Sequence, residues 1–393
     1  MIRLLFISRI NLLAGRTNVY NLAKTCEAVN AQEGFHATLV TTDQESDSQA
    51  FFHKMAIHNP FGIVSLKVTN TVSKYSSQSW YEIIAFLAAN LSLMWFLLKS
   101  MRVFNLVYFR DESLSLAALF AKAILRKKVF FEIHSVLKSK SRQILNMAAT
   151  RSVDGVIAIS AGLKRYYEKS NKNIFISLCS AAEDSWFDYS HHKEDFRKEL
   201  RLPIKAYLIG YTGVVGANPN DDYYELDDIV KSLKTLPEEV ICVVVGEQNA
   251  NSDWLRQVAR GCGVEDRLMI LQWQERSIIP KYLQAFDIIL IPKRKKDLVG
   301  DSPAKMFPAL ASRRPIIGGR TECIEEVLTD GADSIIVEQN NPNGWSRAIL
   351  KIYENSDLAK KLSGQAWLTK DKYTWEKRGI AIAKFIKQTI NHP

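Results

Sequence analysis

One stretch of the chain, residues 302–319, has residue types that could bind an anion. Ser302 and Pro303 predict a helix start, because serine can accept a bond from a free N–H and proline costs nothing at the first helical position. An apolar pair after the helix leads to Gly318 and Gly319, where a ligand can approach the backbone without meeting a Cβ. Helix N-termini favour negative charge. The stretch predicts either an anion site or an ordinary helix–strand–helix segment of an α/β domain.

The densest basic run lies just before this stretch and consists of Lys293, Arg294, Lys295 and Lys296. The whole chain carries a formal net charge of +10. Such a charge favours an anionic partner, which could be a nucleotide, a phospholipid surface or a nucleic acid. Most basic runs are solvated loops, so the charge does not choose among these partners. Without an aromatic-interleaved basic stripe or zinc-finger spacing, we predict no nucleic-acid partner.

The sequence contains none of the short motifs that carry chemistry by themselves. It has no phosphate-binding G-x-x-x-x-G-K-[ST] loop, no G-x-G-x-x-G after the first strand and no G-x-S-x-G elbow. No cluster of His, Cys, Asp and Glu has metal-ligand spacing, so we predict no metal site. The five scattered cysteines indicate a reducing compartment, and the start of the chain resembles a short strand rather than a signal peptide. A cytoplasmic protein is expected, with its site assembled by the fold.

Alternating apolar strands and amphipathic helices run through both halves of the chain. The expected strands are 4–7, 37–42, 63–68, 106–109, 129–133, 155–159 and 174–178, then 207–212, 240–245, 268–271, 288–291, 316–317 and 334–337. Strand–helix–strand repeats form parallel sheets, so two doubly wound, Rossmann-like α/β domains are predicted. We expect domains at 1–185 and 203–374, joined by a polar connection over 184–202. The cleft where two such domains face each other is the default binding site.

Residues 83–98 form the most apolar long segment of the chain. The segment contains Asn90 and Ser92 and is short for a membrane span. It therefore predicts a helix that is either buried in the core or in contact with a membrane surface, and burial is the favoured interpretation.

Several segments, taken in order, resemble retaining glycosyltransferases of the GT-B architecture, specifically the group 1 (family 4) type. They are Phe131-Glu-Ile-His134, Asp154-Gly-Val-Ile-Ala-Ile-Ser160, Tyr282-Leu283 with Asp287, Ser302-Pro-Ala-Lys-Met-Phe-Pro-Ala-Leu-Ala311, Arg314-Pro-Ile-Ile317, Glu326-Val327 with Asp330-Gly331, and Tyr373-Thr-Trp375. The resemblance is strongest from about 268 to 385. It implies that the last helix, 375–393, packs back on the N-terminal domain.

The resemblance implies a hexosyltransferase-like enzyme with a nucleotide-sugar donor and no separate cofactor. The donor would be bound by the C-terminal domain and a glycan, lipid-linked or other glycoconjugate acceptor by the N-terminal domain. Transfer would retain the anomeric configuration and need no metal. His134 would lie near the transferred sugar, although a structural, hydrogen-bonded histidine is the alternative. Residues expected to contact the donor are Gly15, Gly213, Lys293, Ser302, Pro303, Ala304, Lys305 and Glu326. For Gly15 a role in the turn alone, and for Glu326 capping of its own helix N-terminus, are equally open.

The chain departs from the family pattern at the donor site. Gly300 and Pro308 stand where the family has two glutamates, and a proline cannot accept the hydrogen bond of a ribose hydroxyl. The loop 213–222 lacks the usual arginine and lysine for the diphosphate. These departures leave open a GT-B-fold binding or assembly protein without transferase chemistry. A sugar-nucleotide epimerase of the same architecture is a further alternative.

Overall fold

The computed structural model describes residues 1–10, 12, 17–41, 47–66, 79–137, 139–215, 224–246, 250–294, 300 and 302–391. Within it the chain forms two compact units. Unit 1 comprises Met1–Ser180, Leu298–Ser302 and Trp375–Pro393, and unit 2 comprises Ala181–Asp297 and Pro303–Thr374. Each unit is thus assembled from segments that are distant in the sequence.

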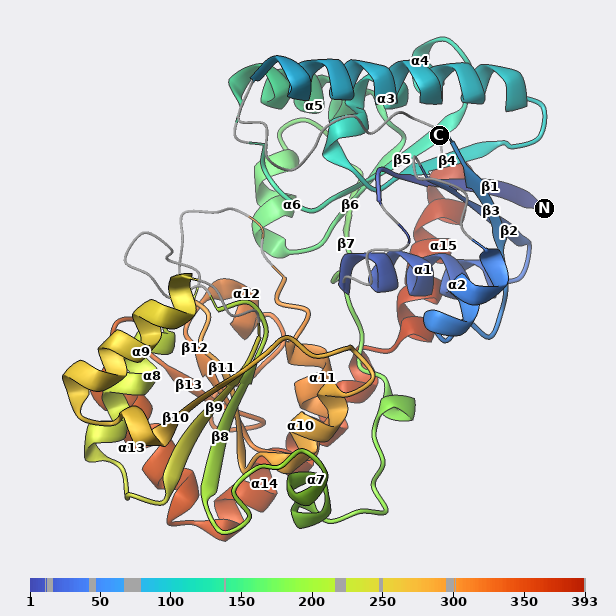
Figure 1. Cartoon of the computed structure of the whole chain (residues 1–393). Helices are drawn as coiled ribbons and strands as arrows, with labels where there is room; N and C mark the ends of the chain where they lie inside the picture. The colour runs from blue at the N-terminus through green and yellow to red at the C-terminus, as the bar shows by residue number, and fades with distance from the viewer. Residues whose placement is uncertain are drawn as a thin grey trace. The chain divides into compact units, whose positions relative to one another are not determined.

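Unit 1 is built on a parallel sheet with the strand order β3-β2-β1-β4-β5-β6-β7. The strands are β1 (Ile2–Ser8), β2 (Phe35–Thr41), β3 (Gly62–Ser65), β4 (Leu106–Phe109), β5 (Lys128–Ile133), β6 (Gly155–Ala158) and β7 (Ile174–Ile176). The helices are α1 (Thr17–Asn30), α2 (Ser48–Lys54), α3 (Ser79–Ser100), α4 (Ser115–Ala123), α5 (Lys140–Ser152), α6 (Ala161–Tyr167) and α15 (Trp375–Asn391). Helices α3, α4 and α5 cover one face of the sheet, and α1, α2 and α15 cover the other (Figure 1).

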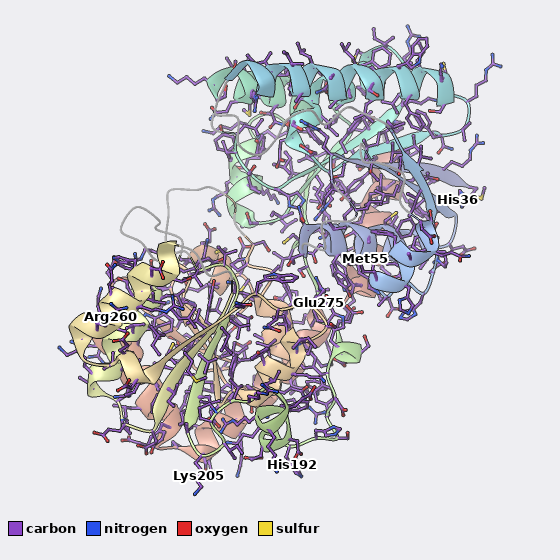
Figure 2. All side chains as sticks on the ribbon, viewed as in Figure 1. His36, Met55, His192, Lys205, Arg260 and Glu275 are labelled. Atoms are coloured by element: carbon purple, nitrogen blue, oxygen red, sulfur yellow. The ribbon has the colours of Figure 1, made fainter. Side chains whose placement is uncertain are left out.

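Unit 2 contains a second parallel sheet, with the order β10-β9-β8-β11-β12-β13. Its strands are β8 (Tyr207–Thr212), β9 (Val240–Val245), β10 (Leu268–Leu271), β11 (Ile288–Ile291), β12 (Ile316–Gly319) and β13 (Ile335–Val337). Its helices are α7 (Lys193–Glu199), α8 (Leu226–Ser232), α9 (Ala250–Cys262), α10 (Ile279–Ala285), α11 (Met306–Ala311), α12 (Glu322–Glu325), α13 (Pro342–Tyr353) and α14 (Ser356–Thr369). The expected fold class, α/β with two parallel sheets, is confirmed. Side chains fill each unit, and His192, Lys205 and Arg260 lie exposed at the outer edge of unit 2 (Figure 2).

The helix expected at Ser302 begins later than predicted. Helix α11 starts at Met306, and the preceding residues form a turn in which the Met306 N–H donates to the Pro303 carbonyl at 3.1 Å. A helix that started at Pro303 would need an N–H from Pro308, which proline lacks. Starting at Met306 places Pro308 in the first turn, where backbone N–H groups have no intrahelical partner. Lys305 therefore occupies the N-cap position rather than a place one turn into the helix.

Three other expectations were wrong in detail. Residues 184–202 are not a plain connection, because they contain α7, whose Arg197 is buried and bonds Asp287 at 2.6 Å. Gly318 and Gly319 end strand β12 instead of forming a loop. Helix α3 is buried on one face only, so the favoured burial of residues 83–98 holds for Leu93 and Leu97 but not for the opposite face.

Gly210, in the middle of β8, shows how tightly the core of unit 2 is packed. A Cβ at this position would lie 2.0 Å from the ring of the fully buried Phe286. Gly210→Ala is expected to lower the free energy of unfolding by about 1–3 kcal/mol, because the buried ring must shift. Urea unfolding measures the change. In the control Gly364→Ala the new Cβ meets nothing within 4 Å on helix α14, and we expect a gain of about 0.5–1 kcal/mol. Equal effects of the two variants would contradict the prediction.

Candidate functional site

In unit 1, polar side chains gather at the carboxyl ends of the neighbouring strands β4 and β5. We name the group formed by Tyr108, Arg110, Glu132, His134 and Arg378 the histidine cluster. Tyr108 lies in β4 and Arg110 directly follows it, while Glu132 lies in β5 and His134 just follows that strand. Residues two apart on a strand point to the same face, so β5 presents Glu132 and His134 together. Arg378 comes from α15.

Glu132 is the centre of the histidine cluster and is fully buried. Its carboxylate accepts from Arg110 Nε at 2.9 Å and from Arg378 Nη2 at 3.0 Å. His134 Nε2 lies 2.7 Å from Glu132 Oε1, and the Tyr108 hydroxyl donates to Oε2. The partly exposed His134 ring, with 26% of its side chain accessible, is therefore held by a buried carboxylate. Such an acceptor fixes the orientation of an imidazole and favours a proton on the bonded nitrogen.

Two carboxylates near His134 have their pKa values shifted in opposite directions. Burial alone would raise the pKa of Glu132, but the charges of Arg378 and Arg110 hold it well below its ordinary value. Burial raises the pKa of Glu112, whose carboxylate accepts from the backbone N–H groups of His134 and, at 2.7 Å, Ser135. Glu112 thus anchors the loop after β5.

In unit 2, four residues form a second group, which we name the lysine–tyrosine cluster: Tyr211, Tyr224, Lys293 and Lys305. Lys305 Nζ lies 4.1 Å from the ring centroids of both tyrosines and donates to the Tyr211 hydroxyl at 2.6 Å. Lys293 Nζ lies 5.2 Å from the Tyr224 centroid, and Lys293 is only 4% exposed. Two ammonium groups therefore share the Tyr224 ring. Cation–π contacts of this kind are worth about 0.5–2 kcal/mol each.

Glycines let backbone and side chains meet closely around this cluster. Gly213, with φ of 143°, follows β8, and a Cβ there would lie 2.6 Å from Lys305 Nζ. A Cβ on Gly246, after β9, would lie 2.0 Å from the Gly213 carbonyl oxygen. Any larger residue at Gly213 would displace the Lys305 ammonium. The predicted residues Gly213, Lys293 and Lys305 are thus brought together in unit 2.

The other predicted site residues have different surroundings. Ser302 is buried in unit 1, where its carbonyl accepts from the Cys179 thiol at 3.3 Å, whereas Pro303 and Ala304 belong to the turn before α11 in unit 2. Glu326 is the C-cap of α12, so it cannot cap the N-terminus of that helix, and its carbonyl accepts from Tyr373. Gly15 lies outside the described residues.

The two positions that depart from the family pattern have a structural explanation. Gly300 has a φ of 94°, and a Cβ there would lie 2.0 Å from Leu163 Cγ. A glutamate at 300 is therefore incompatible with this packing. Pro308 lies in the first turn of α11, where its missing N–H costs no intrahelical hydrogen bond.

Sequence inspection alone did not assign roles to Arg110, Arg378, Tyr211 or Tyr224. Arg110 could have been found because a charged residue directly follows a buried strand. Glu132 could have been found because it stands two residues before His134, a spacing that places both on one face of a strand. No sequence signal indicates that Arg378 reaches Glu132, because 246 residues separate them. Among the described residues, no group of three or more His, Cys, Asp and Glu is placed to hold a metal ion.

These two units define the class of the protein: a two-domain α/β protein of the GT-B fold. Over its full length the fold matches sucrose-phosphate synthase from Thermosynechococcus elongatus, with a TM-score of 0.78, 14% identity and coverage of 100% of both chains. It also matches Anabaena HepE in complex with UDP-glucose, with a TM-score of 0.74, 13% identity and coverage of 99% of this chain and 100% of HepE.

Sequence comparison indicates which family within this fold class the chain resembles. Residues 207–355, which lie in unit 2 except for Leu298–Ser302, match the family model described as glycosyl transferases group 1. A D-inositol 3-phosphate glycosyltransferase of Xylanimonas cellulosilytica is 24% identical over 189 residues, covering 47% of this chain. The chain spans less than half of that relative, 43% of its length. The protein is thus glycosyltransferase-like, with its match to the group 1 family in unit 2.

Proposed function

We propose that the protein is a retaining, metal-independent glycosyltransferase that transfers a sugar from a nucleotide-sugar donor to a glycan, lipid-linked or other glycoconjugate acceptor. Unit 2 binds the donor, through Gly213, Lys293, Lys305, the turn at Pro303 and Ala304, and Glu326. Unit 1 binds the acceptor and presents His134. Gly15 and Ser302 remain further candidates for donor contacts. The five free cysteines support a cytoplasmic site of action.

The lysine–tyrosine cluster is the observation that carries this proposal. Lys293 follows β11 and Gly213 follows β8, and ligands of parallel α/β sheets bind outside the carboxyl ends of the strands. Two ammonium groups lie around one tyrosine ring, and an arrangement of two cations suits the two phosphates of a diphosphate. Lysine binds phosphate as a compact point charge, which suits the neutralisation of a leaving diphosphate.

During the proposed transfer, the bond between the anomeric carbon and the diphosphate oxygen breaks, and its electron pair leaves with the diphosphate. The acceptor hydroxyl oxygen forms the new bond to the anomeric carbon, and its proton passes to the departing phosphate. Charge develops on the diphosphate, so Lys293 and Lys305 stabilise the transition state more than the ground state. His134, oriented by Glu132, contacts the sugar or the acceptor hydroxyl.

The comparisons support the donor class. The fold of HepE in complex with UDP-glucose is the fold of this chain, and the group 1 match covers most of unit 2. A binding or assembly protein without transferase chemistry is the alternative that Gly300 and Pro308 kept open. It is not favoured, because the family match and the curated relative both belong to glycosyltransferases.

A thermal-shift screen tests the proposal with nucleosides, nucleoside diphosphates and nucleotide sugars. A ligand at 100 times its Kd should stabilise the chain by about 2.7 kcal/mol. We expect this stabilisation from the nucleoside diphosphate and the nucleotide sugar of one particular base, but not from the nucleoside of that base alone. The binding nucleotide sugar is then incubated with candidate acceptors. Binding without turnover or donor hydrolysis would favour the assembly protein, and a screen without any shift would contradict the transferase.

A further inference from the structure

Helix α3 carries a long apolar face that is exposed among the described residues of unit 1. Ile84, Leu87, Leu91, Trp95 and Leu98 recur three or four residues apart, which places them on one side of the helix. Leu91 is 61% exposed and Trp95 60%. Among the described residues, only this helix is long and apolar enough to cross a membrane. Only 22% of its segment Ile83–Ser100 is buried.

The opposite face anchors α3 to unit 1, so the helix is not free to span a bilayer. Leu93 and Leu97 are fully buried in the hydrophobic core. Asn90 Nδ2 donates to the Ser113 carbonyl at 2.9 Å, and Asn90 Oδ1 accepts from the Ala117 N–H at 3.0 Å. Crossing a membrane would break these contacts and bury the amide without its partners. A helix with one anchored and one exposed apolar face suits the plane of a membrane interface.

The charges around the exposed face of α3 indicate which kind of membrane surface it would bind. Residues 83–98 contain no charged side chain, and cations stand at the edges of the exposed face. Lys99 Nζ lies 4.7 Å from the Trp95 ring, Arg142 of α5 lies 5.7 Å from the Phe86 ring, and Lys127 donates to the carbonyls of Met101 and Phe104. Together α3, α4 and α5 contain five basic residues and one acidic residue. They lie side by side on one face of the sheet (Figure 1).

We propose that the exposed face of α3 docks unit 1 onto an anionic phospholipid surface, with the apolar stripe inserted at the level of the headgroups and Lys99, Lys127 and Arg142 contacting lipid phosphates. Tryptophan at such an interface places its apolar ring among the acyl chains and its N–H near the headgroups. The docking is independent of the chemistry proposed above, but it would bring a lipid-linked acceptor to unit 1.

Vesicle sedimentation of the full chain tests this inference. We compare vesicles of phosphatidylcholine alone with vesicles that also contain phosphatidylglycerol. The wild-type chain should bind the anionic vesicles, and salt should weaken the binding because it screens the cationic rim. Trp95 should insert into the vesicle. Adding vesicles should therefore shift the tryptophan emission of the wild-type chain to the blue more than that of the Trp95→Gln variant.

A matched pair of variants distinguishes vesicle binding through the α3 face from nonspecific binding through any exposed apolar side chain. Leu91→Gln with Trp95→Gln should weaken vesicle binding by at least about tenfold, since each side chain buries several methylene equivalents. The control, Leu368→Gln with Trp273→Gln, changes side chains of unit 2 that are 60% and 62% exposed, and binding should stay within about twofold of wild type.

Equal loss in both variants, or no vesicle binding by a folded wild-type chain, would overturn the inference. Sedimentation velocity tests the alternative that the exposed face of α3 binds a second copy of the chain. A stable wild-type dimer that Leu91→Gln with Trp95→Gln converts to a monomer, without vesicle binding in either form, would assign the face to self-association instead. Circular dichroism verifies that both variants are folded.

Discussion

Glu132→Gln is expected to lower the free energy of unfolding of unit 1 by about 3–5 kcal/mol, since removing one partner of a buried ion pair leaves the other charges uncompensated. The wild-type carboxylate is bonded by two guanidinium groups, from Arg110 and Arg378, and is fully buried. Glutamine has the same shape but no charge. The penalty therefore comes from the two buried cations, not from lost packing volume.

The pH dependence of stability gives this prediction a second measurement. The folded-state pKa of Glu132 is held well below its ordinary value of 4.5, so between these two values the unfolded chain binds more protons. The stability contributed by the carboxylate is present above pH 4.5 and is lost as the pH falls through the folded-state pKa. The difference between wild type and Glu132→Gln should thus be constant near neutral pH and shrink in acid.

Urea unfolding at pH 7 and in acid, with hydrogen exchange of the β5 amides, reports the change in unit 1. Glu199→Gln is the control, because Glu199 forms an exposed ion pair with Lys281 in unit 2. Pairs of that kind contribute about 0–1 kcal/mol. A loss below about 1 kcal/mol in Glu132→Gln would show that the arginines find other compensation and that the cluster is not an electrostatic unit.

Lys305→Met is expected to reduce the rate of sugar transfer by about 10²–10³-fold, the effect of removing one preorganised donor to a developing negative charge. Methionine can keep packing between the Tyr211 and Tyr224 rings, so the fold should survive. The ammonium, which those rings hold 4.1 Å from their centroids, is lost. The effect should appear in kcat more than in KM, because the charge on the diphosphate grows in the transition state.

The test uses the nucleotide sugar that the thermal-shift screen identifies. Affinity for the nucleoside diphosphate should also fall in Lys305→Met, while affinity for a donor fragment without phosphate should not. Lys205→Met is the matched control, since Lys205 is exposed at the outer edge of unit 2 (Figure 2). A variant that keeps wild-type kcat and diphosphate affinity would remove Lys305 from the donor site.

Local patterns predicted the strands well, because buried runs of β-branched and aromatic residues are hard to mistake. The expected ranges 207–212 and 240–245 are the observed β8 and β9. Short, mixed-charge helices were harder to predict. Helix α7 buries only Phe196 and Arg197, so its periodicity is weak, and α11 begins where the lack of an N–H on Pro308 allows.

Site residues, like secondary structure, were predicted from the sequence only where local patterns indicated them. The family resemblance predicted a role for His134, whereas no role was predicted for its buried partner Glu132. The cage of Tyr211 and Tyr224 around Lys305 depends on side chains far apart in the sequence. Spacing cannot indicate such contacts. The proposed roles of these residues remain predictions for the experiments above.

The position of Arg378 also bears on how the chain folds during synthesis. Arg378 lies in α15, 246 residues after Glu132 in the sequence, yet it neutralises Glu132 and bonds Ser177 in the interior of unit 1. Until α15 leaves the ribosome, the nascent unit 1 lacks a helix that covers its sheet and one of the two cations of its buried carboxylate. Domains usually complete folding in the order of synthesis. Here unit 2, whose segments all precede α15, can reach its final structure first, and the emergence of α15 then completes unit 1.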